Sequence, residues 1–147
     1  MATFIDNRKA HFNYEIVETF EAGIELLGFE VKSIRAGLGN LAGAHAIVRG
    51  GEVFIVGMHI TPYQVANTPK DYDPERTRKL LLNKKEIAKL ADADKAKGLT
   101  LIPMALYSKG RRIKVEIAIA KGKKLHDKRE SIKKRDTDRE IRRSLKE

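Results

Sequence analysis

Two consecutive glycines between two short apolar segments limit the middle of this chain to a β-hairpin. Residues 45–49 precede Gly50-Gly51, and residues 52–56 follow them. A glycine pair accepts the positive φ angles that a two-residue hairpin turn requires. A second hairpin is predicted around residues 108–111, because apolar and charged side chains alternate along its second arm, residues 113–119. The chain is therefore expected to be rich in antiparallel β-structure.

A strand and a short helix are predicted before the first hairpin. From Tyr14 to Leu26 the apolar side chains fall on even positions, with one slip at Val17-Glu18, which is the period of a strand. Gly28 interrupts this pattern, and the apolar spacing that follows fits a helix over residues 28–36.

A longer helix is predicted over residues 74–97. Asp73 offers an N-cap acceptor, Pro74 fixes the first helical φ, and apolar residues then recur at helical spacing as far as Gly98. Leu80 and Leu81 belong to the apolar stripe in this interpretation. The opposite face would be basic, with Arg76, Lys79, Lys84 and Lys85. Residues 61–72 contain two prolines and lack periodicity, so they are expected to form a loop.

These elements predict a mainly β fold with flanking helices. We expect about six strands over residues 1–120, closed into a small antiparallel barrel of the oligonucleotide-binding (OB) type. Helices are too sparse for the βαβ units of a parallel sheet. A chain of 147 residues suits one domain with a substantial core.

Residues 121–147 form a basic C-terminal tail. They contain 12 Lys or Arg and 6 Asp or Glu, and Ile132, Ile141 and Leu145 are too few to bury a stable stripe. Pairs such as Glu130 with Lys134 are four residues apart, where a helix would bring opposite charges together. The tail is expected to be disordered when free and helical when held in an anionic channel.

The charge of the chain points to a polyanionic partner. The formal net charge is +10, of which the tail supplies six, so nucleic acid is the expected target. Spacing alone leaves it open whether the basic residues of the body bind nucleic acid or only solubilise the protein. Glu21 is equally open: it is either a solvated strand residue or an acceptor for base amino groups.

Several other classes of function lack their sequence signals. The chain has no Cys, no phosphate-binding glycine motif, and four scattered histidines outside any metal-binding pattern. No pair of carboxylates predicts acid–base catalysis, so we expect neither an enzyme nor a cofactor or metal site. Without an apolar run of membrane-spanning length or a secretion signal, a soluble cytoplasmic protein is expected.

Three separated motifs resemble the SsrA-binding protein family, also called small protein B. They are EAGIELLGFEVKSIRAG at residues 21–37, RTRKLLL at residues 76–82 and GKKLHDKR at residues 122–129. The resemblance spans nearly the whole chain, from about Asn7 into the tail. It implies a bacterial trans-translation factor whose barrel binds the tRNA-like domain of transfer-messenger RNA (tmRNA, or SsrA RNA). The resemblance also implies that such a factor helps to deliver tmRNA, with elongation factor Tu, to stalled ribosomes. The incomplete polypeptide is then tagged for degradation.

The resemblance also implies where the two RNA contacts lie. The face for the tRNA-like domain is expected to contain Glu21, Leu81 and Lys114, together with Lys32 and Arg35. The tail is expected to enter the empty messenger channel of the small ribosomal subunit. Its residues for the decoding centre and this channel are Lys121, Lys123, Lys124, His126, Asp127, Lys128, Arg129, Lys133 and Lys134.

Two other functions are compatible with the residues themselves. A general RNA-binding or ribosome-assembly module would share the charge and the barrel, but it would not select tmRNA. A metal-dependent RNA-processing enzyme would cleave RNA when magnesium or manganese is added. We expect a monomer that binds RNA without cleaving it and has no membrane partner.

Overall fold

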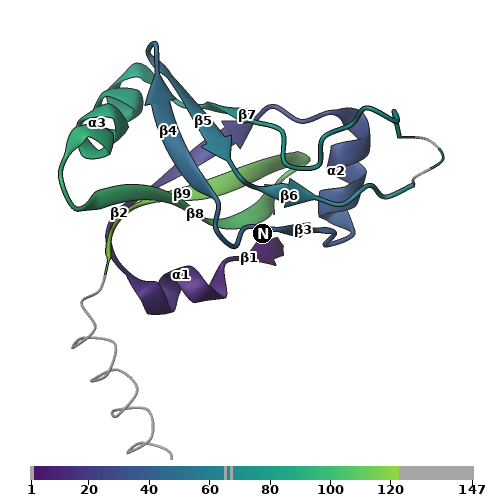
Figure 1. Cartoon of the computed structure of the whole chain (residues 1–147), viewed down its shortest axis with the longest axis horizontal. Helices are drawn as coiled ribbons and strands as arrows, with labels where there is room; N and C mark the ends of the chain where they lie inside the picture. The colour runs from purple at the N-terminus through teal and green to yellow at the C-terminus, as the bar shows by residue number, and fades with distance from the viewer. Residues whose placement is uncertain (1, 65, 67, 123–147) are drawn as a thin grey trace, which may run out of the picture.

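The computed structural model describes residues 2–64, 66 and 68–122 (Figure 1). The helices are α1 (Arg8–Asn13), α2 (Gly28–Arg35) and α3 (Lys84–Lys95). The long strands are β2 (Tyr14–Ile24), β8 (Leu99–Lys109) and β9 (Arg112–Gly122), and the short ones are β1 (Thr3–Asp6), β3 (Gly39–Asn40), β4 (His45–Arg49), β5 (Glu52–Val56), β6 (His59–Ile60) and β7 (Arg78–Leu81). None of the helices in these ranges is long and apolar enough to cross a membrane.

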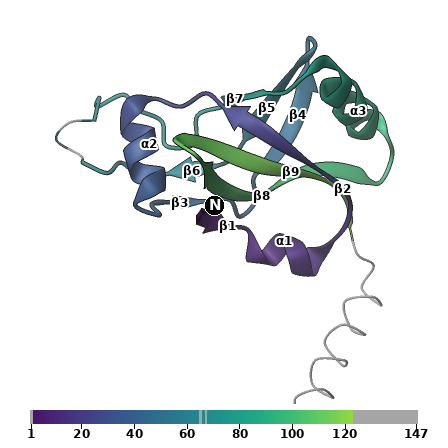
Figure 2. The same ribbon diagram turned by 180° about the vertical axis from the view of Figure 1, so that it is seen from behind.

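Six antiparallel strands pair into a closed ring. The strand order is β1-β8-β4-β5-β7-β2-β9, and β9 also pairs with β8. The strands β8, β4, β5, β7, β2 and β9 therefore form a closed ring. β1 pairs with residues 105–107 of β8, further along that strand than the β4 pairing at Leu101, while β3 and β6 form a separate small sheet. Helices α2 and α3 lie at opposite ends of the ring, as Figures 1 and 2 show. The predicted mainly β fold with flanking helices is confirmed.

Both predicted hairpins are confirmed. Arg49 pairs with Glu52 across Gly50 and Gly51, whose φ angles are 59° and 75°. Such angles are accessible to glycine at little steric cost. In the second hairpin Lys109 pairs with Arg112, so its turn consists of Gly110 and Arg111. The predicted helix over residues 28–36 is present as α2.

The slip in the alternation of the first strand is a β-bulge. Ile16 pairs with Ala120 and Glu18 pairs with Ile119, which leaves Val17 as the extra residue of β2. The side chain of Val17 is consequently exposed.

The predicted helix over residues 74–97 is wrong in its first ten residues. Residues 78–81 form strand β7, in which Arg78 and Leu80 are buried and Leu81 is exposed. The Asp73 carboxylate accepts a hydrogen bond from the Glu75 backbone N–H at 2.9 Å and therefore caps only a turn. As a result, Arg76, Lys79, Lys84 and Lys85 do not share one helix face.

The helix begins instead at Lys84, after a capping box. The Asn83 side chain accepts a hydrogen bond from the Glu86 N–H at 2.9 Å, and the Glu86 carboxylate accepts one from the Asn83 N–H at 3.3 Å. This reciprocal arrangement satisfies two donors that a helix start leaves unpaired.

Two segments at the ends of the described chain were not predicted. β1 and α1 precede β2, and β9 extends two residues beyond Ala120, the predicted end of the barrel. Lys121, assigned to the tail, pairs with Glu15 of β2 and Leu99 of β8. The predictions for residues 123–147 lie outside the described residues.

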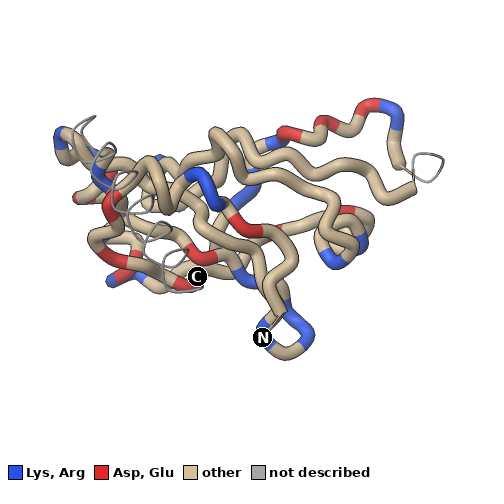
Figure 3. Tube along the Cα trace, turned by 90° about the horizontal axis from the view of Figure 1, so that it is seen from below, with Lys and Arg blue, Asp and Glu red and all other residues tan. Residues whose placement is uncertain are grey.

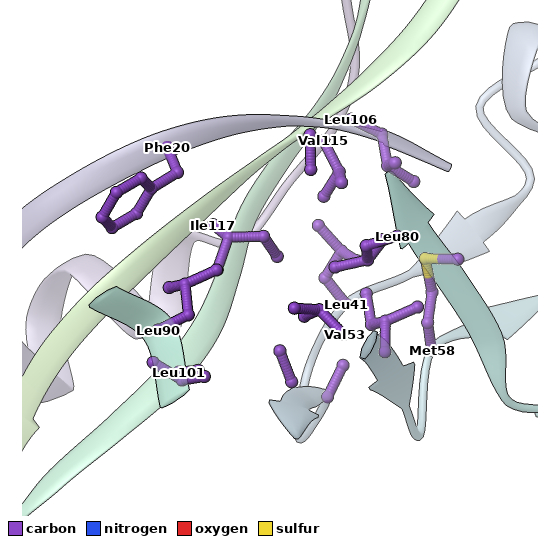
Figure 4. Packing of buried hydrophobic residues seen from close by; sticks show 14 of the residues in the cluster. Phe20, Leu41, Val53, Met58, Leu80, Leu90, Leu101, Leu106, Val115 and Ile117 are labelled. Carbon is purple, nitrogen blue, oxygen red and sulfur yellow. The ribbon is translucent and has the colours of Figure 1, made fainter. Parts of the chain in front are cut away.

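The core lies inside the ring. Figure 4 shows inward side chains from β2, β5, β7, β8 and β9 in contact with one another. Leu90 of α3 is fully buried and joins this cluster, which fixes the helix over one end of the ring. A smaller cluster packs Ala10 of α1 against Ile102, Met104, Ala118 and Ala120.

A buried charge cluster holds α2 against β7. Glu30 and Arg78 are both fully buried, and the Arg78 guanidinium donates to Glu30 Oε2 at 2.6 Å from Nη2 and 2.9 Å from Nε. Arg76 donates to both carboxylate oxygens, and the Tyr72 hydroxyl donates to Oε2 at 2.7 Å. The Leu27 N–H at the start of α2 also donates to Glu30 Oε1, at 2.8 Å.

The same hydrogen bonds keep Glu30 ionised. Burial opposes the charge, but the hydrogen bonds from Arg76, Leu27, Arg78 and Tyr72 outweigh it and lower the pKa of Glu30 from 4.5 to about 2. A carboxyl group whose pKa falls on folding stabilises the folded state above its unfolded pKa. This contribution is lost as the pH falls through the folded pKa.

Replacing Glu30 by Gln is expected to lower the free energy of unfolding by about 3–5 kcal/mol at neutral pH, because two arginines lose a buried partner. The difference in the free energy of unfolding between wild type and Glu30→Gln should be constant above about pH 5. It should shrink as the pH falls from 4.5 towards 2. Urea unfolding of both proteins over this range measures it.

Glu52→Gln is the matched control, because Glu52 forms an exposed ion pair with Lys79 at 3.0 Å. It should change the free energy of unfolding by less than about 1 kcal/mol. A Glu30→Gln protein as stable as this control would contradict the role of the buried cluster.

Candidate nucleic-acid interface

One row of paired residues crosses four strands on the outside of the ring. Gly23 of β2 pairs with Leu81 of β7 on one side and with Lys114 of β9 on the other, and Lys114 pairs with Tyr107 of β8. Residues directly opposite in antiparallel strands point to the same face of a sheet. The row therefore presents an exposed leucine, a gap, a lysine and a tyrosine in sequence.

Gly23 makes room in this row. A Cβ atom at position 23 would lie 3.2 Å from Cβ of Leu81, closer than ordinary van der Waals contact. The missing side chain lets Leu81 lie against the backbone of β2. The side chain of Leu81 nevertheless remains 50% exposed on the outer face.

A groove of about 380 Å³ opens beside Leu81. Its aliphatic wall comprises Ile24, Leu26, Val31, Leu81 and Ile113, and its basic side comprises Arg111, Arg112 and Lys114. Arg35 of α2 donates to the carbonyl of Arg111 at 2.9 Å, which connects the end of α2 to the hairpin turn. No carboxylate lines the groove among the described residues.

These two walls suit RNA. Arginine and lysine side chains bind phosphates and position the nucleic acid, whereas an apolar surface accepts the face of an unstacked base. We call this groove with Glu21, Tyr107 and Lys109 the hairpin face, because the β8–β9 hairpin supplies most of its polar groups.

Glu21 lies one row away from Lys114 on the hairpin face. The Lys109 ammonium lies 3.1 Å from Oε1 and 3.3 Å from Oε2 of Glu21. The hydrogen bond from Lys109, followed by one from the Tyr107 hydroxyl, lowers the pKa of Glu21. Burial and the bond to Glu21 raise the pKa of Tyr107 to about 12. At neutral pH Glu21 is thus an anion that accepts hydrogen bonds from Lys109.

The structure brings together most of the residues predicted for the body. Glu21, Leu81 and Lys114 share the hairpin face, and Arg35 reaches it through Arg111. Lys32 lies apart, in a pocket with Gly28, Phe29, Tyr63 and Gln64.

The predicted tail residues lie elsewhere. Lys121 is at the opposite end of β9 from Lys114, about 23 Å away at the rise of a strand. The other predicted tail residues lie outside the described part of the chain: Lys123, Lys124, His126, Asp127, Lys128, Arg129, Lys133 and Lys134.

Sequence reasoning left several groups out of the site. Gly23, Val31, Tyr107, Lys109 and Arg112 all belong to the hairpin face. A signal for three of them was present, because a two-residue turn at Gly110 places Lys109 opposite Arg112 and Tyr107 opposite Lys114. The position of β2 beside this hairpin is a long-range pairing that no local pattern contains.

Overall charge alone does not locate the interface. Lys and Arg occur on several sides of the described chain and are interspersed with Asp and Glu (Figure 3). Over the same residues, no group of three or more His, Cys, Asp or Glu side chains could hold a metal ion.

Leu80→Ala and Leu81→Ala should separate stability from binding. Leu80 is 2% exposed, so its truncation should lower the free energy of unfolding by about 2–5 kcal/mol. Leu81→Ala should leave stability within about 1 kcal/mol but weaken RNA binding several-fold. Urea unfolding and filter binding measure the two effects, and equal destabilisation by both changes would show that Leu81 is a core residue.

Comparison with known proteins places the chain in a family. The family described as SmpB protein matches residues 4–147. The SsrA-binding protein of Gloeothece citriformis is 53% identical over 141 residues, covering 96% of this chain and 91% of the relative. That of Burkholderia vietnamiensis is 52% identical over 138 residues, covering 94% of this chain and 93% of the relative.

A solved structure has the same fold. It is described as "tmRNA-SmpB: a journey to the center of the bacterial ribosome" and matches with a TM-score of 0.70 and 43% sequence identity. The match covers 82% of this chain and 85% of the solved chain. On the family match and on identities above 50% over nearly its whole length, the chain belongs to the SmpB family of SsrA-binding proteins.

Proposed function

We propose that this chain binds tmRNA and acts with it in trans-translation, the rescue of stalled ribosomes. The observation that carries the proposal is the hairpin face, an aliphatic groove bordered by three basic side chains on a member of the SsrA-binding protein family. Its similarity to a solved chain from a tmRNA–SmpB study of the ribosome supports the same function.

The geometry suits a folded RNA better than a regular duplex. Arg111, Arg112 and Lys114 are close enough together to contact adjacent phosphates, while the aliphatic wall offers an apolar surface for a base outside a helix. Proteins that read RNA specifically usually bind such unstacked bases in loops and bends. The tRNA-like domain of tmRNA is the ligand that we assign to this face.

The chain works by binding and positioning in this proposal, not by catalysis. The hairpin face holds the tRNA-like domain, and the complex is delivered with elongation factor Tu to the ribosomal A site. The basic tail enters the messenger channel of the small subunit only when that channel is empty. The incomplete polypeptide is then tagged, and a monomer in the cytoplasm suffices for every step.

The positions of the two contacts support a division of labour. Lys114 and Lys121 lie near opposite ends of one continuous strand. The tail therefore departs about 23 Å from the hairpin face, so one molecule can hold tmRNA at one end and place its tail in the ribosome at the other.

Competition binding tests selectivity. The full chain should bind tmRNA at least tenfold more tightly than an ordinary transfer RNA at about 150 mM salt, because phosphate attraction is common to both RNAs and the groove contacts are not. Fluorescence anisotropy with a labelled tRNA-like domain measures the preference.

Equal affinity for the two RNAs that disappears as salt rises would leave a general RNA-binding or ribosome-assembly module. Loss of intact RNA in the presence of magnesium would instead indicate an RNA-processing enzyme. Lys89→Met is a matched control, because Lys89 pairs with Glu18 away from the groove and should not change the preference.

Removing the tail should separate RNA binding from tagging. The cut belongs after Gly122, since a cut after Ala120 would remove two paired residues of β9. The affinity of the shortened chain for the tRNA-like domain should lie within about threefold of that of the full chain, because the hairpin face is retained. The shortened chain should not support tagging in a reconstituted translation reaction. Normal tagging would contradict the role assigned to the tail.

A further inference from the structure

We infer that Glu21 acts on RNA through Lys109: it is a positioning residue, and the lysine ammonium makes the contact, with the ring of Tyr107 as a second contact beside it. This inference rests on the proposed function, since it concerns the hairpin face. It assigns two binding residues, Lys109 and Tyr107, and makes Glu21 the group that holds the Lys109 ammonium in place.

The contact of Glu21 with Lys109 spans three strands. Glu21 is on β2 and pairs with Glu116 of β9, while Lys109 is the last residue of β8 and pairs with Arg112 of β9. The ion pair therefore passes over the outer surface of β9. The row of Lys114 and Tyr107 lies between the rows of Glu21 and Lys109, so the contact holds the Lys109 ammonium close to Lys114.

The Glu21 carboxylate is already engaged by Lys109. Both carboxylate oxygens lie within 3.3 Å of the Lys109 ammonium. An ionised carboxylate has about four acceptor positions. A base amino group would have to compete for the remaining capacity or displace Lys109.

Lys109 keeps donors for a phosphate. Its side chain is 58% exposed, against 36% for Glu21, so the ammonium is the more accessible partner. An ammonium has three N–H donors, and those that do not point at Glu21 are free to bind an RNA oxygen. A carboxylate on a phosphate-binding face repels RNA, and restricting Lys109 beside Lys114 is a benefit that can outweigh this repulsion.

Tyr107 supplies the aromatic group of the hairpin face. It is half-buried and pairs with Lys114 across the hairpin. A half-buried tyrosine ring on a strand has few conformations to lose, so it can stack on an unpaired base at a low entropic cost.

A double-mutant cycle tests the inference. Affinity for the labelled tRNA-like domain is measured for wild type, Glu21→Gln, Lys109→Met and the double variant. Each single change should weaken binding about tenfold, and the double variant should also be about tenfold weaker, because both changes remove the same contact. A loss of about 100-fold in the double variant would show independent contacts and overturn the inference.

A second readout excludes a merely structural effect. Glu21→Gln and Lys109→Met should each reduce the slope of log affinity against log salt by about one, because each loses the same phosphate contact. Glu18→Gln, which removes the Glu18–Lys89 ion pair on the same strand, should change neither affinity nor slope. An unchanged slope in Glu21→Gln with weakened binding would assign Glu21 a direct contact to a base.

Tyr107 is tested by two substitutions. Tyr107→Phe keeps the ring and should retain affinity within about threefold, whereas Tyr107→Leu should lose about tenfold, as base stacking on an aromatic ring predicts. Wild-type affinity in Tyr107→Leu would overturn the stacking role. If the wild-type chain shows no preference for tmRNA over transfer RNA, the proposed function fails. The double-mutant cycle of Glu21 and Lys109 can then still be measured with any RNA that the chain binds.

Discussion

The buried ion pair of Glu30 with Arg78 determines how α2 lies against the ring. Two fully buried charges are costly to remove from water unless each donor and acceptor is satisfied. Here Arg76, Tyr72 and the start of α2 complete the bonds to Glu30, while Arg78 also donates to the carbonyls of Met58, Pro74 and Arg76. No buried side-chain nitrogen or oxygen in the described chain lacks a partner. Moving α2 would break this cluster, so the position of the helix is closely defined.

That constraint extends to the groove. Val31 follows Glu30 directly, Leu81 lies three residues after Arg78, and both line the groove beside the β8–β9 hairpin. Arg35 then connects the end of α2 to Arg111 in the hairpin turn. The surface that we propose for RNA is therefore assembled in the chain alone, which lowers the entropic cost of binding. In this proposal the buried cluster contributes to recognition by placing the walls of the groove, without touching the ligand.

Local patterns predicted the fold well where the structure is local. The glycine pair at residues 50–51 and the alternation over residues 113–119 identify both hairpins, and the slip at Val17 is a real bulge. The helix predicted over residues 74–97 was wrong only in its first ten residues. There Arg78 is buried in an ion pair with Glu30, 48 positions away, and helical spacing could not reveal that partner. Glu21, Leu81 and Lys114 entered through family resemblance. Tyr107 and Lys109 could have been found from the register of the second hairpin, but their contact with β2 is long-range.

We propose that tmRNA binds at one end of the ring and the ribosome at the tail, and lysine-reactivity footprinting tests this arrangement directly. A limited acetylation reaction followed by mass spectrometry reports the reactivity of each lysine in the free chain, with the tRNA-like domain, and with a stalled ribosome added. We predict that the tRNA-like domain protects Lys109 and Lys114 but not Lys123, Lys124 or Lys128, which become protected only on the ribosome. Protection of the tail lysines by the tRNA-like domain alone, with Lys114 unchanged, would contradict the account.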